Sequence, residues 1–246
     1  MRLLLTGATG VAGLNIYRAA LTDPDVTSIT ILMRREMPSW AAVPSNASQK
    51  TTTIVHKDFT SYPPDLVGRL VQHDACIWAM GKSSLGMSEA DYTSLTYAAP
   101  MSLAVALRDA GIGKNRPEDK PFRFVYVSGE GADPTDKSSQ MWARVKGRAE
   151  KDIAALCTAA TGMKAHVIRP AYFRPSREYS QDWANQRSRT ENYLDRLLSP
   201  VFTCFFPQFV SPLDELSKVS LEIAKGRWPD VELFRNQKIR ELAKQC

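Results

Sequence analysis

The chain has 246 residues, of which 43% are hydrophobic and 24% are charged, so its composition is that of an ordinary globular protein. A single α/β domain can fill this length, and neither glycine nor proline is enriched enough to indicate a disordered or fibrous chain. The formal net charge is +6, but the lysines and arginines are scattered, which argues against a specific nucleic-acid partner.

Short apolar runs alternate with helical stretches as far as Arg169. Residues 2–6 predict a strand, a glycine-bearing turn follows, and residues 11–21 have helical spacing. Further strands are expected at 28–33, 52–56, 75–80, 122–128 and 165–169, with helices at 66–72, 87–110 and 137–160. Because parallel strands need crossover connections, this order predicts an α/β fold with a Rossmann-type doubly wound parallel sheet and helices on both faces.

Two regions break this alternation. Residues 35–50 contain Pro38 and Pro44 and predict a surface loop or a poorly formed helix. After Arg169 the chain is irregular and rich in Arg, Tyr and Phe, before helices near 212–225 and 236–245. Ligands bind at the carboxyl ends of parallel strands, so we expect residues 170–246 to form a small substrate-side cap on a single domain spanning 1–246.

The cysteines and the chain's first residues suggest a compartment. Four cysteines lie far apart without a CxxC pair, which favours neither a zinc site nor a disulfide framework. The first strand begins at Arg2, leaving no space before it for a targeting segment, so we expect a cytoplasmic protein. Residues 197–210 are too short and too interrupted by proline to span a bilayer, and we expect no transmembrane segment.

Three glycines follow the first strand with the spacing G-x-x-G-x-x-G, at Gly7, Gly10 and Gly13. Glycine permits a tight turn, leaves room for a pyrophosphate and allows close helix packing, while the helix amino terminus offers N–H groups to phosphates. The alternative is a strand-to-helix turn in which glycine only relieves steric conflict. The context favours a dinucleotide site. Its expected contacts come from Thr6, Gly7, Thr9, Gly10, Val11 and Ala12.

The residues after the second strand indicate which dinucleotide binds. NAD sites commonly place a carboxylate there for the ribose 2′-hydroxyl, whereas this chain has Arg34 and Arg35. Two guanidinium groups suit a 2′-phosphate, so we predict NADP(H). NAD stays possible if the two arginines are solvated and Glu36 turns back to the ribose.

Two further loops are candidates for contacts with the cofactor. Asp58 and Phe59 follow the third strand and suit an adenine, while Ala79, Met80 and Gly81 end the fourth and would let ribose and phosphates lie on the backbone. Either loop is equally compatible with a purely structural role.

Several of these segments resemble the short-chain dehydrogenase/reductase superfamily, specifically its atypical branch that includes the HIV Tat-interacting protein. The resemblance covers nearly the whole chain. It rests on TGATG at 6–10, MRR at 33–35, Asp58-Phe59, YVSGEGAD at 126–133, VKGRAE at 145–150, Arg169-Pro170 and LFRN at 233–236.

The resemblance implies a nicotinamide cofactor and a catalytic Ser, Tyr and Lys. Ser128 and Lys146 match the Ser and the Lys, and Arg169, Pro170 and Ala171 are expected beside the cofactor. The Tyr position, however, holds Trp142. Indole cannot release and recover a proton near neutral pH, so the usual general acid is missing.

Trp142 leaves several functions open. The chain can be an oxidoreductase on a small carbonyl or alcohol, with Tyr172, Tyr126 or Lys146 handling the proton. Alternatively, it is a non-catalytic regulator that senses NADP(H) and binds a protein partner through an aromatic tail comprising Tyr172, Trp183 and residues 202–209. Both a monomer and a homodimer are compatible with the long helices.

Overall fold

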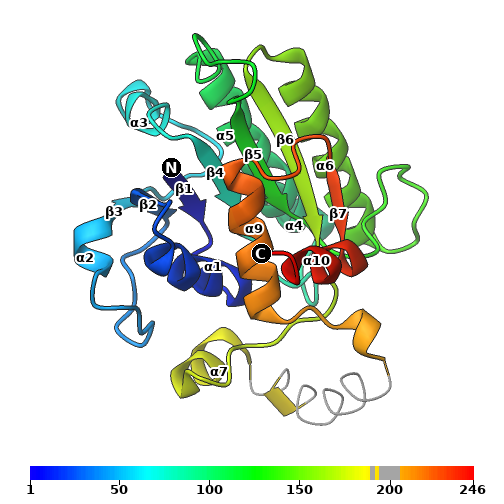
Figure 1. Ribbon diagram of the computed structural model, residues 1–246. Helices are drawn as coiled ribbons and strands as arrows, with labels where there is room; N and C mark the ends of the chain where they lie inside the picture. The colour runs from blue at the N-terminus through cyan, green and yellow to red at the C-terminus, as the bar shows by residue number, and fades with distance from the viewer. Residues whose placement is uncertain (189–191, 194–205) are drawn as a thin grey trace.

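The computed structural model describes residues 1–188, 192–193 and 206–246, and Phe202 to Phe205 of the expected aromatic tail lie outside them. Its centre is a seven-stranded sheet in the order β3-β2-β1-β4-β5-β6-β7, with every neighbouring pair parallel (Figure 1). This confirms the predicted Rossmann-type fold. The strands are β1 (Arg2–Thr6), β2 (Ser28–Met33), β3 (Thr51–Val55), β4 (Ala75–Trp78), β5 (Phe122–Val127), β6 (Met163–Arg169) and β7 (Leu233–Arg235).

Both faces of the sheet are buried, because alternate strand side chains enter two separate apolar clusters. Leu3 and Leu5 of β1 pack into one cluster and Leu4 into the other. The first cluster lies under α1 (Val11–Thr22), α9 (Leu213–Lys225) and α10 (Asn236–Ala243). The second lies under α3 (Pro64–Leu70), α5 (Ala99–Asp109) and α6 (Met141–Ala159).

The structure differs from the expected elements in two places and agrees with the expected loop after β2. The predicted helix at 87–110 is divided into α4 (Glu89–Thr93), a π-helical turn (Ser94–Ala98) and α5, next to Pro100, which has no N–H to continue the helical bonding. As expected for residues 35–50, the segment after β2 is a loop with only the short α2 (Ala47–Lys50). Strand β7 has three residues and was not predicted, because so short a run carries no periodicity.

The chain after β6 forms helices in two separate places. Helices α9 and α10 pack on the sheet beside α1, with the short 3-10 turn at Pro207–Phe209 before them. Helix α7 (Ser180–Gln186) lies apart from α9 and α10 (Figure 1), and it contacts Arg18 of α1 and Thr9 just before α1. Whether these residues cover a substrate stays a prediction.

A buried ion pair fixes α7 to α1. The guanidinium of Arg18 donates from two nitrogens to the two carboxylate oxygens of Asp182, at 2.6 and 2.9 Å. Arg18 also donates to the carbonyl of Ala42 and lies 3.5 Å from the ring centroid of Tyr179. The two charged side chains are only 7% and 0% exposed, so each charge depends on the other.

Asp182→Asn should therefore lower the free energy of unfolding by about 3–5 kcal/mol, because it leaves the buried Arg18 without its counter-charge. The control is Asp25→Asn. Asp25 is 71% exposed and shares Lys225 with Asp23 and Glu222, so its loss should cost less than about 1 kcal/mol. Urea unfolding measures both, and equal losses would contradict the assigned role of the Arg18–Asp182 pair.

Candidate functional site

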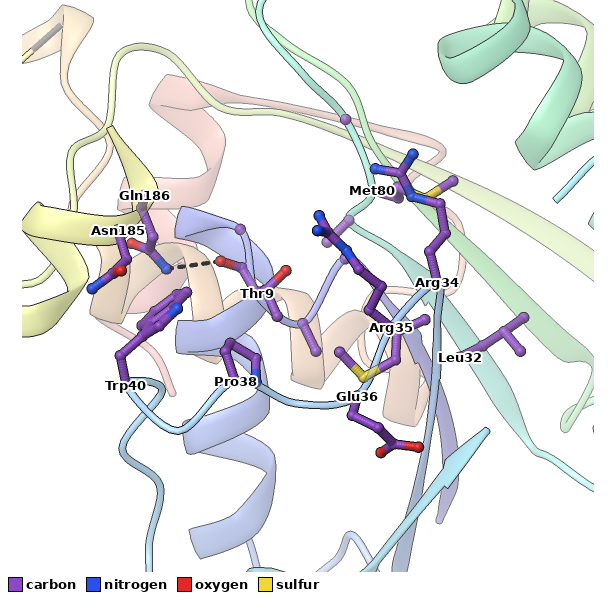
Figure 2. Close-up of a pocket in the computed structure, with 16 residues that line it drawn as sticks. Thr9, Leu32, Arg34, Arg35, Glu36, Pro38, Trp40, Met80, Asn185 and Gln186 are labelled. Carbon is purple, nitrogen blue, oxygen red and sulfur yellow. Dashed lines mark hydrogen bonds between the residues drawn. The ribbon is translucent and has the colours of Figure 1, made fainter. Parts of the chain in front are cut away.

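A cavity of about 490 Å³ opens at the carboxyl ends of β1, β2 and β4 (Figure 2). This is the edge at which α/β sheets bind ligands, and the volume lies within the range of small-molecule sites. The lining comes from four parts of the chain, namely the glycine turn, the loop after β2, the loop after β4 and the end of α7. Its residues are Gly7, Ala8, Thr9, Gly10, Leu32, Met33, Arg34, Arg35, Glu36, Pro38, Trp40, Ala79, Met80, Gly81, Asn185 and Gln186.

The glycine turn is formed by backbone contacts that exclude side chains. Gly7 has φ +72°, and a Cβ there would lie 2.4 Å from the carbonyl oxygen of Ala79. A Cβ on Gly13 would lie 2.1 Å from the carbonyl oxygen of Gly7. No side chain caps α1 at Gly10, so the first-turn N–H groups of Val11 and Ala12 are available to an anion.

The loop after β2 brings two cations to the cavity. Arg34 and Arg35 are exposed, and neither forms an ion pair with a described residue. Figure 2 shows the Arg35 guanidinium extending towards Thr9 and that of Arg34 towards Met80, while the Glu36 carboxylate points away from both. This arrangement gives one end of the cavity a positive charge that no described neighbour neutralises.

The loops after β3 and β4 differ in their relation to the cavity. Ala79, Met80 and Gly81 line it. Asp58 and Phe59 do not: Asp58 accepts bonds from the backbone and the hydroxyl of Thr60, and Phe59 is buried edge-on against Trp78. These hydrogen bonds from Thr60 lower the pKa of Asp58. Asp58 and Phe59 therefore have local structural partners, and their contact with an adenine stays a prediction.

Ser128 and Lys146 meet at the end of β5. The Lys146 Nζ donates to the carbonyl oxygen of Ser128 at 2.8 Å. The Ser128 hydroxyl is buried and has no hydrogen-bond partner in the described part of the chain, which is costly unless a ligand supplies one. Burial lowers the pKa of Lys146 to about 8, although the nearby Glu150 opposes this shift.

Trp142 lies one helical turn before Lys146, at the expected Tyr position. Its indole nitrogen donates to the side-chain oxygen of Gln140, and a Cβ on Gly131 would lie 3.2 Å from the indole rim. Trp142 is thus held against the loop after β5 and has already committed its one donor.

Arg169 forms a structural ion pair. Its guanidinium donates to both oxygens of Glu150, at 2.5 to 3.1 Å, and the side chains are 11% and 6% exposed. Pro170 accepts the backbone N–H of Glu130, and Ala171 donates to the Ser211 hydroxyl. These three residues fasten β6 to its neighbours, and none lines the cavity.

Tyr172 is placed by its backbone, which donates to Phe209 and accepts from Ser211. It does not line the cavity either, so its expected catalytic role stays a prediction. Conversely, sequence reasoning missed Trp40, Asn185 and Gln186, which do line it. No local pattern marks these residues, since Gln186 reaches the glycine turn from 177 positions away.

The site fits a dinucleotide on its own geometry. The glycine turn is a cradle that a Cβ would fill. Three of the buried side-chain oxygens that have no hydrogen-bond partner among the described residues are Thr6 Oγ1 just before the turn, Gln186 Oε1 of a residue that lines the cavity, and Ser128 Oγ after β5. These features suit a ligand with phosphates and hydroxyl groups.

Solved structures agree with this reading of the fold. A short-chain dehydrogenase/reductase from Saccharomyces cerevisiae superposes with a TM-score of 0.62 at 15% identity, covering 96% of this chain and 95% of that one. A 3-oxoacyl-[acyl-carrier protein] reductase from Brucella melitensis, solved with NAD, gives 0.69 at 12% identity over 96% and 94%. This chain shares the Rossmann-type fold of these two proteins. No family model matches it, and its resemblance to the Tat-interacting branch stays a prediction.

Sequence relatives correct the expected location. This chain is 29% identical to "Protein fmp52, mitochondrial" of Emericella nidulans over 179 residues, 72% of this chain and 69% of the relative. It is 25% identical to "Protein FMP52-1, mitochondrial" of Scheffersomyces stipitis over 252 residues, all of both chains. The expectation of a cytoplasmic protein is wrong on this comparison, because scattered cysteines do not separate the cytosol from other reducing compartments.

None of the helices in the described part of the chain has the length and apolar character needed to cross a membrane.

Gly7→Ala tests the turn. The new Cβ would clash with the Ala79 carbonyl at a positive φ, so the variant should lose about 1–3 kcal/mol of unfolding free energy. The control is Gly68→Ala in α3, where a Cβ meets nothing within 4 Å and should leave stability unchanged or raise it by up to ~1 kcal/mol. Thermal unfolding of both variants checks this, and an unharmed Gly7→Ala protein would refute the close approach.

Proposed function

We propose that the chain is a single domain that binds NADP(H) in this cavity and acts as an oxidoreductase on a small carbonyl or alcohol. The observation that carries the proposal is that the glycine cradle shares one cavity with two arginines, neither of which has an ion-pair partner among the described residues. The pyrophosphate would lie on the first-turn N–H groups of α1, held by Gly7, Thr9 and Gly10. The backbone at Ala79 to Gly81 would form the floor.

The preference for NADP(H) over NAD(H) rests on charge. Arg34 and Arg35 have no described carboxylate partner, and a 2′-phosphate would supply one with bidentate geometry. Glu36 belongs to the same loop, but its carboxylate points away from the guanidinium groups in Figure 2. An adenosine ribose without a phosphate would leave both cations unpaired.

Arg34→Ser combined with Arg35→Ser should weaken NADPH binding by roughly 10- to 100-fold and change NADH binding little, because charged hydrogen bonds contribute about 1.5–3 kcal/mol. The charge-matched control is Arg69→Ser with Lys120→Ser, two exposed residues outside the cavity. Fluorescence titration with each nucleotide measures the ratio. Equal weakening by both pairs of substitutions would refute specific phosphate recognition.

The remaining chemistry concerns a proton. The nicotinamide supplies hydride chemistry when bound, so carbonyl reduction needs a proton donor at the product oxygen. Trp142 cannot donate one, whereas Lys146 has a pKa of about 8 and touches Ser128. We assign the proton to the Lys146 ammonium and positioning of the substrate oxygen to the Ser128 hydroxyl. Tyr172 is the second candidate donor.

This assignment fixes a pH dependence. The Lys146 ammonium is present below its pKa, so reduction should be constant at low pH and fall as pH rises through about 8. Lys146→Met should abolish turnover and Tyr172→Phe should retain it. NADPH absorbance with a panel of aldehydes and ketones measures both. The reverse result, loss of turnover only in Tyr172→Phe, would show that Tyr172 and not Lys146 is the proton donor.

A second function is favoured by Trp142 itself. Its indole is engaged with Gln140 and packed on Gly131, so the position of the usual general acid has a structural use. A non-catalytic protein that senses NADP(H) and binds a protein partner needs no general acid, so a structural Trp142 is compatible with that function. Tight NADPH binding with no turnover on any substrate of the panel would favour this regulator over the enzyme.

A further inference from the structure

Helix α7 extends the cavity from outside the expected cofactor-binding motifs. The Gln186 side-chain nitrogen donates to the carbonyl oxygen of Thr9 in the glycine turn at 3.1 Å, shown as a dashed line in Figure 2. Asn185 and Gln186 both line the cavity. The last turn of α7 therefore lies against the segment that is proposed to hold phosphates.

The contact with Thr9 determines what Gln186 presents to a ligand. A carbonyl oxygen only accepts, so the amide must turn its NH₂ group to Thr9 and its oxygen the other way. That oxygen, Oε1, is buried and accepts no hydrogen bond from any residue that the structure describes. It needs a donor, which an ionised phosphate oxygen cannot be and a hydroxyl group can.

The anchoring of α7 keeps this oxygen in place. Asp182 lies one turn before Gln186 and forms the buried pair with Arg18, while Tyr179 packs on the same guanidinium. Arg18 belongs to α1, the helix that begins at the glycine turn. The turn and the Gln186 amide are thus fastened to one helix, so their separation is set before a ligand arrives.

We propose that residues 179–186 form a clamp on the adenosine half of the cofactor, in which Gln186 Oε1 accepts a hydrogen bond from the ribose 3′-hydroxyl. This rests on the proposed binding of NADP(H). The adenosine ribose is chosen because Arg34 and Arg35 share the cavity with Gln186, whereas Ser128 and Lys146 do not line it. A 2′-phosphate on those arginines leaves the 3′-hydroxyl as the neighbouring donor. Arg18 and Asp182 are positioning residues.

The test uses adenosine 2′,5′-bisphosphate and its 3′-deoxy analogue in calorimetric titrations. With the unmodified chain, removal of the 3′-hydroxyl should weaken binding about five- to tenfold, the loss of one hydrogen bond. Gln186→Met should weaken the parent bisphosphate equally and should no longer discriminate between the two ligands. The matched control is Gln181→Met, an exposed residue of the same helix outside the cavity, which should behave as the unmodified chain.

Each outcome decides a separate claim. If the unmodified chain does not bind the bisphosphate, the proposed function fails and the clamp fails with it. If it binds but Gln186→Met keeps both affinities, the clamp alone is overturned. For the positioning pair, Arg18→Met with Asp182→Leu should weaken the bisphosphate and speed amide hydrogen exchange in residues 183–186, while nicotinamide mononucleotide affinity stays unchanged. Unchanged exchange and affinity would remove the positioning role.

Discussion

The backbone of Gly7 lies so close to the end of β4 that no side chain fits between them, and most of the site depends on that contact. Because Gly13 likewise touches Gly7, helix α1 begins directly over the carboxyl edge of the sheet. The contact joins the turn to Ala79 and Met80 on one side, and the parallel register of β1 with β2 brings Arg34 and Arg35 to the other. One cavity results from three loops that are separate in the sequence.

Helix α1 also holds α7 in place. Its Arg18 binds Asp182 in a buried pair, and α7 then reaches back to Thr9 through Gln186. The same helix therefore holds both the glycine turn and the Gln186 side chain that contacts it. Removing a buried counter-charge is costly, so the position of α7 is tied to the stability of the whole domain.

Local rules explain which features the sequence revealed. Strand periodicity, the glycine spacing and Arg34-Arg35 are short-range signals, and each was found where the structure has it. Strand β7 carries no such signal, because its three residues become a strand only by pairing with β6. The Arg18–Asp182 and Gln186–Thr9 contacts bridge 164 and 177 positions, so no local pattern announces them. Arg169 shows what a short motif does not reveal. The motif predicts that Arg169 lies beside the cofactor, and the structure shows that its guanidinium pairs with Glu150 of α6.

The central claim is that the glycine cradle and its two arginines hold a phosphorylated dinucleotide. Isothermal titration calorimetry of the unmodified chain with NADPH and then NADH tests it most directly. The account predicts saturable binding at one molecule per chain, with NADPH the tighter ligand. Absence of binding for both nucleotides at roughly millimolar concentration, which corresponds to about 4 kcal/mol of binding free energy, would contradict it.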